Sequence, residues 1–447
     1  MILVNRLFYW GYRATDNMWH WARRRFTLAG LCMAAGFVLA GVASVDIENA
    51  ETYQSFASLL GFLLLAIAGS FFFRSKFAVR RFLPRIGTAG QSLHYRVAIK
   101  NQSATKQTGL TWLEDLADPR PTFVEWLAFH KAEGRRVRPF VAGQRRRKSP
   151  FRLATVKAVE VPPLAEQGEA EMHVEVFPMR RGILHFKSVT LARPDPFGLF
   201  RSFITVPAAQ TILILPKRYP IPPITLPGAL RYQECGVALA ANPGRSEEFV
   251  ALREYRHGDP LRHIHWRSWA RTGKPIVKEF EDTFLARHAL VLDTFDDEPD
   301  SEVLEEAVSV TASFACTVLT QESQLDLLFV NNQSYCFTAG RGLAHVDDML
   351  KILALVSHCR DKKFEVLEQL VLYHVPAVSG CICVLLKWDE VRKEFVEKLR
   401  VSGVELLVLV VMPPGRPKPD AGPLRDTPEC FHVLEVGEIA EKLAQLK

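Results

Sequence analysis

The sequence predicts a multidomain protein with a two-helix transmembrane hairpin, a β-sandwich-like middle domain and a doubly wound α/β domain at the carboxyl end. Three observations predict this organisation. Two uncharged apolar stretches lie near the start, short alternating runs follow, and strand and helix patterns alternate in the last third. We place the boundaries at residues 1–84, 85–226 and 227–447.

The composition fits a globular chain of several domains. The 447 residues correspond to about three domains, and 48% are hydrophobic and 23% charged. These values exclude a disordered or fibrous protein. The net charge of +7 is too small to indicate nucleic acid by itself. The eight cysteines are scattered without a CxxC pair, which is typical of reduced thiols rather than a disulfide framework.

The predicted hairpin consists of residues 26–45 and 56–73, each long enough to cross a hydrocarbon core of roughly 30 Å. Basic residues flank both outer ends, and acidic residues lie between the spans. The positive-inside rule then predicts the inner (plasma) membrane, two spans and both termini cytoplasmic. A signal peptide and a buried helix pair are the alternatives. The flanking residues are Arg23, Arg24, Arg25, Arg74, Lys76, Arg80 and Arg81.

The middle of the chain alternates between polar and apolar residues, which indicates half-buried antiparallel strands. Such runs cover 93–99, 172–176, 183–191 and 211–215, so we expect a β-sandwich or barrel. A basic block at 131–152 fits a solvated loop, a contact with acidic membrane lipid, or nucleic-acid binding. Stacking aromatics are nearly absent from it, so we expect no nucleic acid as a partner.

The most informative stretch covers residues 247–281. It contains two strong turn signals, Gly258-Asp259-Pro260 and Thr272-Gly273-Lys274, and ends in a strand-like run. Arginine, lysine and carboxylate residues surround Tyr255, Trp266 and Trp269. Such a mixture is typical of bidentate arginine–carboxylate pairs and arginine–aromatic stacking, at a structural seam or at an interaction face.

This stretch resembles the prokaryotic family known as domain of unknown function 58. The upstream segment 180–200, which contains Asp195-Pro196-Phe197-Gly198-Leu199-Phe200, resembles it as well. Two amino-terminal spans and a β-rich middle fit the layout of that family. The matching motif residues are Arg253, Glu254, Tyr255, Gly258, Asp259, Arg262, Ile264, Trp266, Ala270, Arg271, Thr272, Gly273, Val277, Lys278, Glu279, Phe280 and Glu281.

One departure from the family pattern concerns histidine. The family has Asp before the tryptophan, whereas this chain has His265. On a strand, His263 and His265 would lie on one face, with His257 nearby. A metal site there is the functional interpretation, and two hydrogen-bonding surface histidines are the alternative.

The last third shows strand patterns at 285–292, 325–330, 334–338, 380–386 and 404–411, and helix patterns at 301–319, 344–357, 390–401 and 436–446. The family resemblance implies a von Willebrand factor A-like domain here. That fold often carries Asp-x-Ser-x-Ser at a metal site. The corresponding residues are Asp293, Phe295 and Asp297, with Asp389 as a distal acid. Phenylalanine cannot coordinate Mg²⁺, so we expect no cofactor. If Mg²⁺ does bind to this degenerate motif, Asp293 is its candidate ligand.

The sequence lacks the common nucleophile, phosphate-loop, dinucleotide and zinc-protease motifs, so we expect a protein that is not an enzyme. The resemblance implies a cytoplasm-facing adaptor that works with a MoxR-type AAA+ ATPase, and with a transglutaminase-like membrane protein, in assembling or maturing another protein. A metal-dependent hydrolase using Asp293, Asp297 and the His263/His265 pair is the competing hypothesis. The expected partner-binding residues are Arg253, Glu254, Tyr255, Arg256, Asp259, Arg262, Trp266, Arg271 and Lys278.

Overall fold

The structure is a computed structural model of the whole chain. Two compact units divide at residues 217 and 218. The structure describes residues 2–43, 50–70, 73, 75–117, 122–123, 126–127, 130, 153–222, 249–256, 259, 261–280, 287–296, 301–319, 324–340 and 345–446. The basic block predicted at 131–152 lies outside the described residues.

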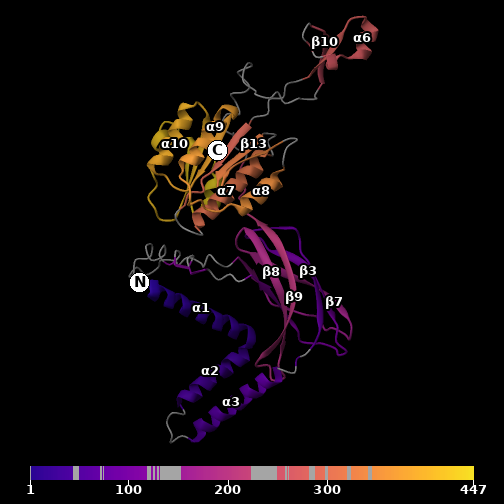
Figure 1. Ribbon diagram of the computed structural model, residues 1–447, viewed down its shortest axis with the longest axis vertical. Helices are drawn as coiled ribbons and strands as arrows, with labels where there is room; N and C mark the ends of the chain where they lie inside the picture. Colours follow the sequence, from indigo (N-terminus) through magenta and orange to yellow (C-terminus); the bar gives the residue numbers. More distant parts are fainter. Residues whose placement is uncertain are drawn as a thin grey trace. The chain divides into compact units, whose positions relative to one another are not determined.

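Three helices open the first unit: α1 (Ile2–Arg25), α2 (Leu28–Ala43) and α3 (Ala50–Ser70). Helices α2 and α3 lie side by side (Figure 1), with the rings of Phe37 and Phe56 stacked 4.7 Å apart. Helix α3 contains an 18-residue window, Tyr53–Ser70, that is long and apolar enough to cross a membrane. The apolar part of α2, Leu28–Val42, is shorter. Among the described helices, α3 is therefore the one that is long and apolar enough to cross a membrane.

Two sheets form a β-sandwich in the first unit. The strand order is β1-β3-β7-β5 in one sheet and β2-β9-β8-β4-β6 in the other. Apolar residues from both sheets share one core, which includes the fully buried Trp112, Phe186 and Val97. The predicted runs at 93–99, 172–176, 183–191 and 211–215 lie within β3, β7, β8 and β9. The strands are β1 (Phe77–Phe82), β2 (Ile86–Thr88), β3 (Leu93–Asn101), β4 (Thr111–Leu116), β5 (Ala154–Val156), β6 (Val159–Glu160), β7 (Glu169–Pro178), β8 (Gly182–Pro194) and β9 (Arg201–Leu215).

Strand β1 corrects one part of the sequence interpretation. It pairs with β3 and therefore belongs to the sandwich, although it lies before the boundary predicted at residue 85. Arg81, which we assigned to the basic membrane flank, has a fully buried side chain. It forms an ion pair with Glu114 and cannot serve as a surface charge next to the membrane. Arg74 lies outside the described residues.

Glu114 is the centre of a buried polar network between the two sheets. Arg81 donates Nε to Oε1 at 3.1 Å and Nη2 to Oε2 at 2.9 Å, and Trp112 Nε1 donates to Oε1 at 3.0 Å. The Tyr95 hydroxyl donates to the same carboxylate. Burial raises the pKa of Glu114 and also that of Tyr95. Donors from three strands hydrogen-bond to the carboxylate, and these bonds offset the cost of burying its charge.

The turn between β8 and β9 joins the sandwich to the helices. The Asp195 carboxylate accepts hydrogen bonds from the backbone N–H of Leu199 at 2.6 Å and of Phe200 at 2.9 Å, which fixes the turn. Thr27 N then donates to the Leu199 carbonyl at 3.1 Å. A Cβ on Gly30 would lie 2.0 Å from that carbonyl oxygen, so only glycine permits this approach. The segment 180–200, which resembled the family, therefore connects the sandwich to the helices within the first unit.

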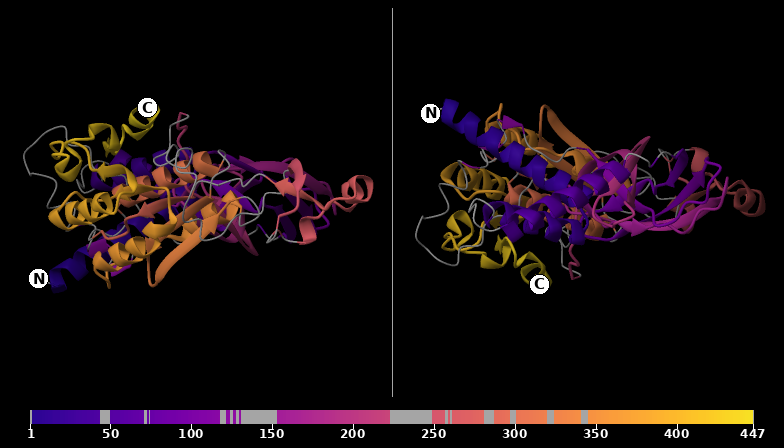
Figure 2. Two further views of the ribbon diagram at one scale, coloured as in Figure 1. Left: turned by 90° about the horizontal axis from the view of Figure 1, so that it is seen from above. Right: turned by 90° about the horizontal axis from the view of Figure 1, so that it is seen from below.

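The second unit contains a six-stranded sheet in the order β14-β13-β12-β15-β16-β17. All neighbouring strands are parallel except the edge strand β14. The sheet is drawn in orange and yellow in Figures 1 and 2. The strands are β12 (Arg287–Leu292), β13 (Gln324–Val330), β14 (Ser334–Ala339), β15 (Gly380–Leu385), β16 (Glu405–Met412) and β17 (Phe431–Glu435), and the helices are α7 (Glu302–Leu319), α8 (Val346–Leu355), α9 (Glu365–His374), α10 (Glu390–Val401) and α11 (Ile439–Ala444).

The second unit confirms the prediction of a mixed α/β domain. Helices α9 and α10 bury Leu367, Val371 and Phe395 against one face of the sheet. Alternate residues of the strands face the other side, where α7 packs on β12, β13, β15 and β16. Helix α9 and strand β17 were absent from the predicted elements.

Candidate functional site

The family-like segment forms a small module of its own. Strand β10 (Phe249–Glu254) pairs antiparallel with β11 (Ile276–Phe280), and the 3₁₀ turn η1 (Leu261–His263) and helix α6 (Trp266–Thr272) lie between them in the chain. Ile264 and Val277 are buried and form a bridge between the turn and β11. Gly273 ends α6 with φ of 72°, a left-handed conformation that glycine adopts without strain.

An ion pair between Arg253 and Asp259 fixes the loop that leaves β10. Arg253 donates Nη1 and Nη2 to the two carboxylate oxygens of Asp259, at 2.7 and 2.8 Å. The backbone N–H of Arg256 donates to the same carboxylate at 2.8 Å. The hydrogen bonds from Arg253, followed by that from Arg256, lower the pKa of Asp259 to about 2. Both predicted residues therefore hold the module together.

The other predicted polar residues are distributed over the module. Glu254 pairs with Lys274 at 3.2 Å, and Tyr255 N donates to the Pro275 carbonyl at 2.9 Å. Lys278 is half-buried on β11, opposite Leu252. Three of the predicted arginines are exposed, Arg256, Arg262 and Arg271, and Arg267 is exposed as well. These cations are available on the surface of the module, whereas the Arg253–Asp259 pair is structural.

An aromatic surface lies on α6. The rings of Trp266 and Trp269 stack with centroids 5.2 Å apart and an interplanar angle of 18°. The exposed fraction of Trp266 is 65%, and that of Leu261 is 67%. We call Trp266 and Trp269 the tryptophan face. Trp269 and Leu261 were not among the predicted partner-binding residues, although the i, i+3 spacing of the tryptophans would have placed both on one side of a helix.

The histidine prediction requires correction. His263 ends the turn η1, and His265 is the residue before α6, so the two do not alternate along a strand. His265 Nδ1 and Ser268 Oγ share a hydrogen bond of 2.6 Å. His257 lies outside the described residues. Within the described part of the chain, no three His, Cys, Asp or Glu side chains are grouped to hold a metal ion.

Asp293, the candidate metal ligand, lies fully buried at the end of β12. Its Oδ1 accepts the backbone N–H of Phe295 at 2.9 Å, and its Oδ2 accepts that of Leu386 at 3.2 Å. Arg392 Nε donates to Oδ2 at 2.8 Å, while its Nη1 donates to Asp389 at 2.8 Å. The guanidinium of Arg392 therefore lies between the two carboxylates predicted as metal ligands. Asp297 lies outside the described residues.

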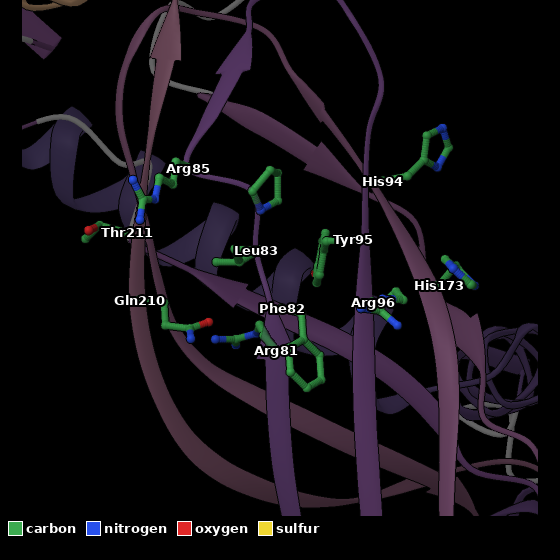
Figure 3. A pocket seen from close by; sticks show the side chains of 11 residues that line it. Arg81, Phe82, Leu83, Arg85, His94, Tyr95, Arg96, His173, Gln210 and Thr211 are labelled. Carbon is green, nitrogen blue, oxygen red and sulfur yellow. The ribbon is translucent and has the colours of Figure 1, made fainter.

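A basic cavity of about 780 Å³ lies on the sandwich of the first unit (Figure 3). Arg85 and Thr211 lie on one side of it, and His94 and His173 on the other. Arg81 also lines the cavity, but its charge is already paired with Glu114. The side chains in Figure 3 point in different directions, so we assign no ligand to this cavity.

Comparisons with known proteins agree with the motif. Residues 251–437 match the family described as Protein of unknown function DUF58. The uncharacterized protein YeaD of Bacillus subtilis is 29% identical over 192 residues, which are 42% of this chain and 46% of YeaD. The matched region thus spans less than half of that relative. The family resemblance of the motif is confirmed for this region.

Two solved structures are similar to about a third of the chain. The CARDB domain of a Pyrococcus furiosus protein is 9% identical, with 31% of this chain and 94% of that chain covered and a TM-score of 0.17. A PapD-like domain of human CEP192 is 11% identical, with 31% and 85% covered and a TM-score of 0.18.

Proposed function

We propose that this protein is a membrane-anchored adaptor that binds a MoxR-type AAA+ ATPase through the tryptophan face and acts in the assembly or maturation of another protein. The observation that carries the proposal is the stacked tryptophan pair on α6, in which Trp266 is exposed and Trp269 is half-buried. Tryptophan and arginine are the residues most enriched at the energetic centres of protein interfaces. Four exposed arginines, Arg256, Arg262, Arg267 and Arg271, lie on the same module.

The helices α2 and α3 supply the anchor in this proposal. Large apolar side chains on both helices are exposed, including Leu28, Val42 and Leu64. Exposing such surface to water costs roughly 25 cal/mol per Å², whereas lipid accepts it without cost. The helices would form a hairpin of two spans in the inner membrane, with both termini and the following domains cytoplasmic, and with lipid as their partner.

The second unit supports the same assignment through its strand order, which is that of a doubly wound sheet with one antiparallel edge strand. This order fits the von Willebrand factor A-like domain that the motif implies. The adaptor would present the tryptophan face to the ATPase, while another surface recruits the client or a transglutaminase-like membrane protein. We propose no enzymatic role, because the carboxylate of Asp293 is already bound by Arg392.

Co-purification from native cells tests the proposal. The tagged full chain would be extracted in mild detergent with a non-hydrolysable ATP analogue. We expect an AAA+ ATPase to co-purify with the wild type, and Trp266→Ser to reduce its amount roughly tenfold or more, as for the loss of a hot-spot side chain. Trp266 is exposed, so its replacement should leave the fold intact.

Tyr373 provides a matched control, because it is an aromatic residue with an exposed fraction of 82% on helix α9. The Tyr373→Ser variant should retain the ATPase at the wild-type level. Equal loss in both variants, or equal retention in both, would contradict a role for the tryptophan face.

A further inference from the structure

In the six-stranded sheet of the second unit, the side on which the chain adds successive strands changes at β12. From β12 the chain continues to β13 on one side, and later strands β15, β16 and β17 extend the sheet on the other side. The carboxyl ends of the parallel strands β12 and β15 therefore flank a topological switch point. In open α/β sheets, ligands bind in the crevice outside the strands at such a point.

A cavity of about 540 Å³ lies at this switch point. Phe295 follows β12 in the chain and Lys387 follows β15, and both line the cavity. The cavity is completed by Val391 and Arg392 of α10, by Glu365 at the start of α9, and by Cys359, Arg360, Lys362, Lys363 and Phe364 before that helix. This volume falls in the range of small-molecule sites, roughly 300–1,000 Å³.

The lining of this cavity is strongly basic. Arg360, Lys362 and Lys363 line it and do not pair with Asp293 or Asp389, whereas Glu365 is the carboxylate among the described lining residues. The charge of Arg392 is already matched by Asp293 and Asp389. The guanidinium of Arg392 lies over the ring of Phe364 at 4.6 Å, which gives the cavity a rigid floor. Lys387 lines the cavity as well.

We propose that this crevice binds a phosphate-bearing small molecule. Lysine side chains act as mobile point charges that suit a multiply charged phosphate, and Lys362 and Lys363 both line the cavity. The rings of Phe295 and Phe364, which meet edge to face at 68°, provide apolar side chains beside the charged rim. This inference concerns a site separate from the tryptophan face and does not depend on the proposed adaptor role.

Calorimetric titration of the detergent-solubilised full chain with inorganic pyrophosphate, in a phosphate-free buffer, tests the site. We expect binding by the wild type and an affinity reduced roughly tenfold or more by the double substitution Lys362→Ala and Lys363→Ala, because the change removes two charge-assisted contacts. Lys363 is exposed and Lys362 half-buried, so the fold should tolerate the change.

The double substitution Arg416→Ala and Lys418→Ala is the matched control. Both residues are exposed, neither lines the cavity, and the change in net charge is the same. This control should bind pyrophosphate like the wild type. Equal affinities for the two double variants, or absence of binding by the wild type at millimolar concentrations, would overturn the proposal.

Titrations with ADP and with succinate show which kind of phosphate-bearing molecule the crevice recognises. ADP that binds more tightly than pyrophosphate would support a nucleotide whose base contacts the apolar floor. Equal affinities for ADP and pyrophosphate would support recognition of the diphosphate group alone. Succinate that binds as tightly as pyrophosphate would overturn the proposal, because the site would then recognise any dianion, such as an acidic peptide.

Discussion

Replacing Glu114 by alanine should unfold the β-sandwich under conditions in which the wild type is folded. The change leaves the Arg81 guanidinium without its carboxylate while its side chain stays fully buried. Breaking a buried ion pair in this way costs about 3–5 kcal/mol. The Tyr95 hydroxyl and the Trp112 indole N–H also lose their acceptor, each at a further cost of about 1–3 kcal/mol. The sum approaches the whole stability of a typical domain.

Hydrogen exchange measured peptide by peptide is the suitable readout, because it reports the sandwich separately from the rest of the chain. Strands β1 and β3 should lose protection in Glu114→Ala. Glu175 is the matched control, since it also accepts side-chain hydrogen bonds, from Ser92 and Lys157, but lies at the surface of the same unit. Glu175→Ala should exchange like the wild type. Equal protection of β1 in both variants would show that the buried network contributes little.

The second large effect is expected for Arg392→Met. This change leaves the buried Asp293 with two backbone N–H donors but no cation, and it also removes the partner of Asp389. The expected loss is about 3–5 kcal/mol, seen as faster hydrogen exchange in β12 and β15. Methionine keeps much of the volume of the arginine stem, so the charge rather than the packing is tested.

Arg400 is the control on the same helix, because it forms a surface pair with Glu397 and its side chain is 45% exposed. Arg400→Met should leave the exchange of β12 and β15 unchanged. Millimolar Mg²⁺ should not alter the exchange of the wild type, since Arg392 already supplies the positive charge at Asp293. Unchanged protection in Arg392→Met, or strong stabilisation of the wild type by Mg²⁺, would contradict this account.

Local patterns predicted most of the regular structure. The strands of the sandwich and of the six-stranded sheet alternate or are continuously apolar, and these periods are visible within a few residues. Strand β1 was missed because Arg80 and Arg81 follow an apolar span, which is typical of a cytoplasmic flank. The burial of Arg81 depends on Glu114, which lies 33 residues away in sequence, and a local pattern cannot reveal such a pairing.

The candidate functional site was also predicted only in part, because local patterns reveal contacts between residues close in sequence and not those between distant ones. The Arg253–Asp259 pair is close in sequence, and the turn signal between the two residues was recognised. Helix α6 was missed because His263, Ile264 and His265 alternate as in a strand, whereas Trp266 and Trp269 follow a helical spacing. The contact of Asp293 with Arg392 joins residues 99 positions apart, so the sequence suggested a metal ligand where the fold places a guanidinium.

Site-specific photo-cross-linking tests the central claim, the binding of an AAA+ ATPase through the tryptophan face, most directly. A photoreactive phenylalanine analogue would replace Ala270, which is exposed one helical turn after Trp266 on α6, in one variant and Tyr373 in another, in native cells and within the full chain. The account predicts a cross-link to the ATPase from position 270 and none from position 373. A cross-link from position 373 alone, or none from either position, would contradict it.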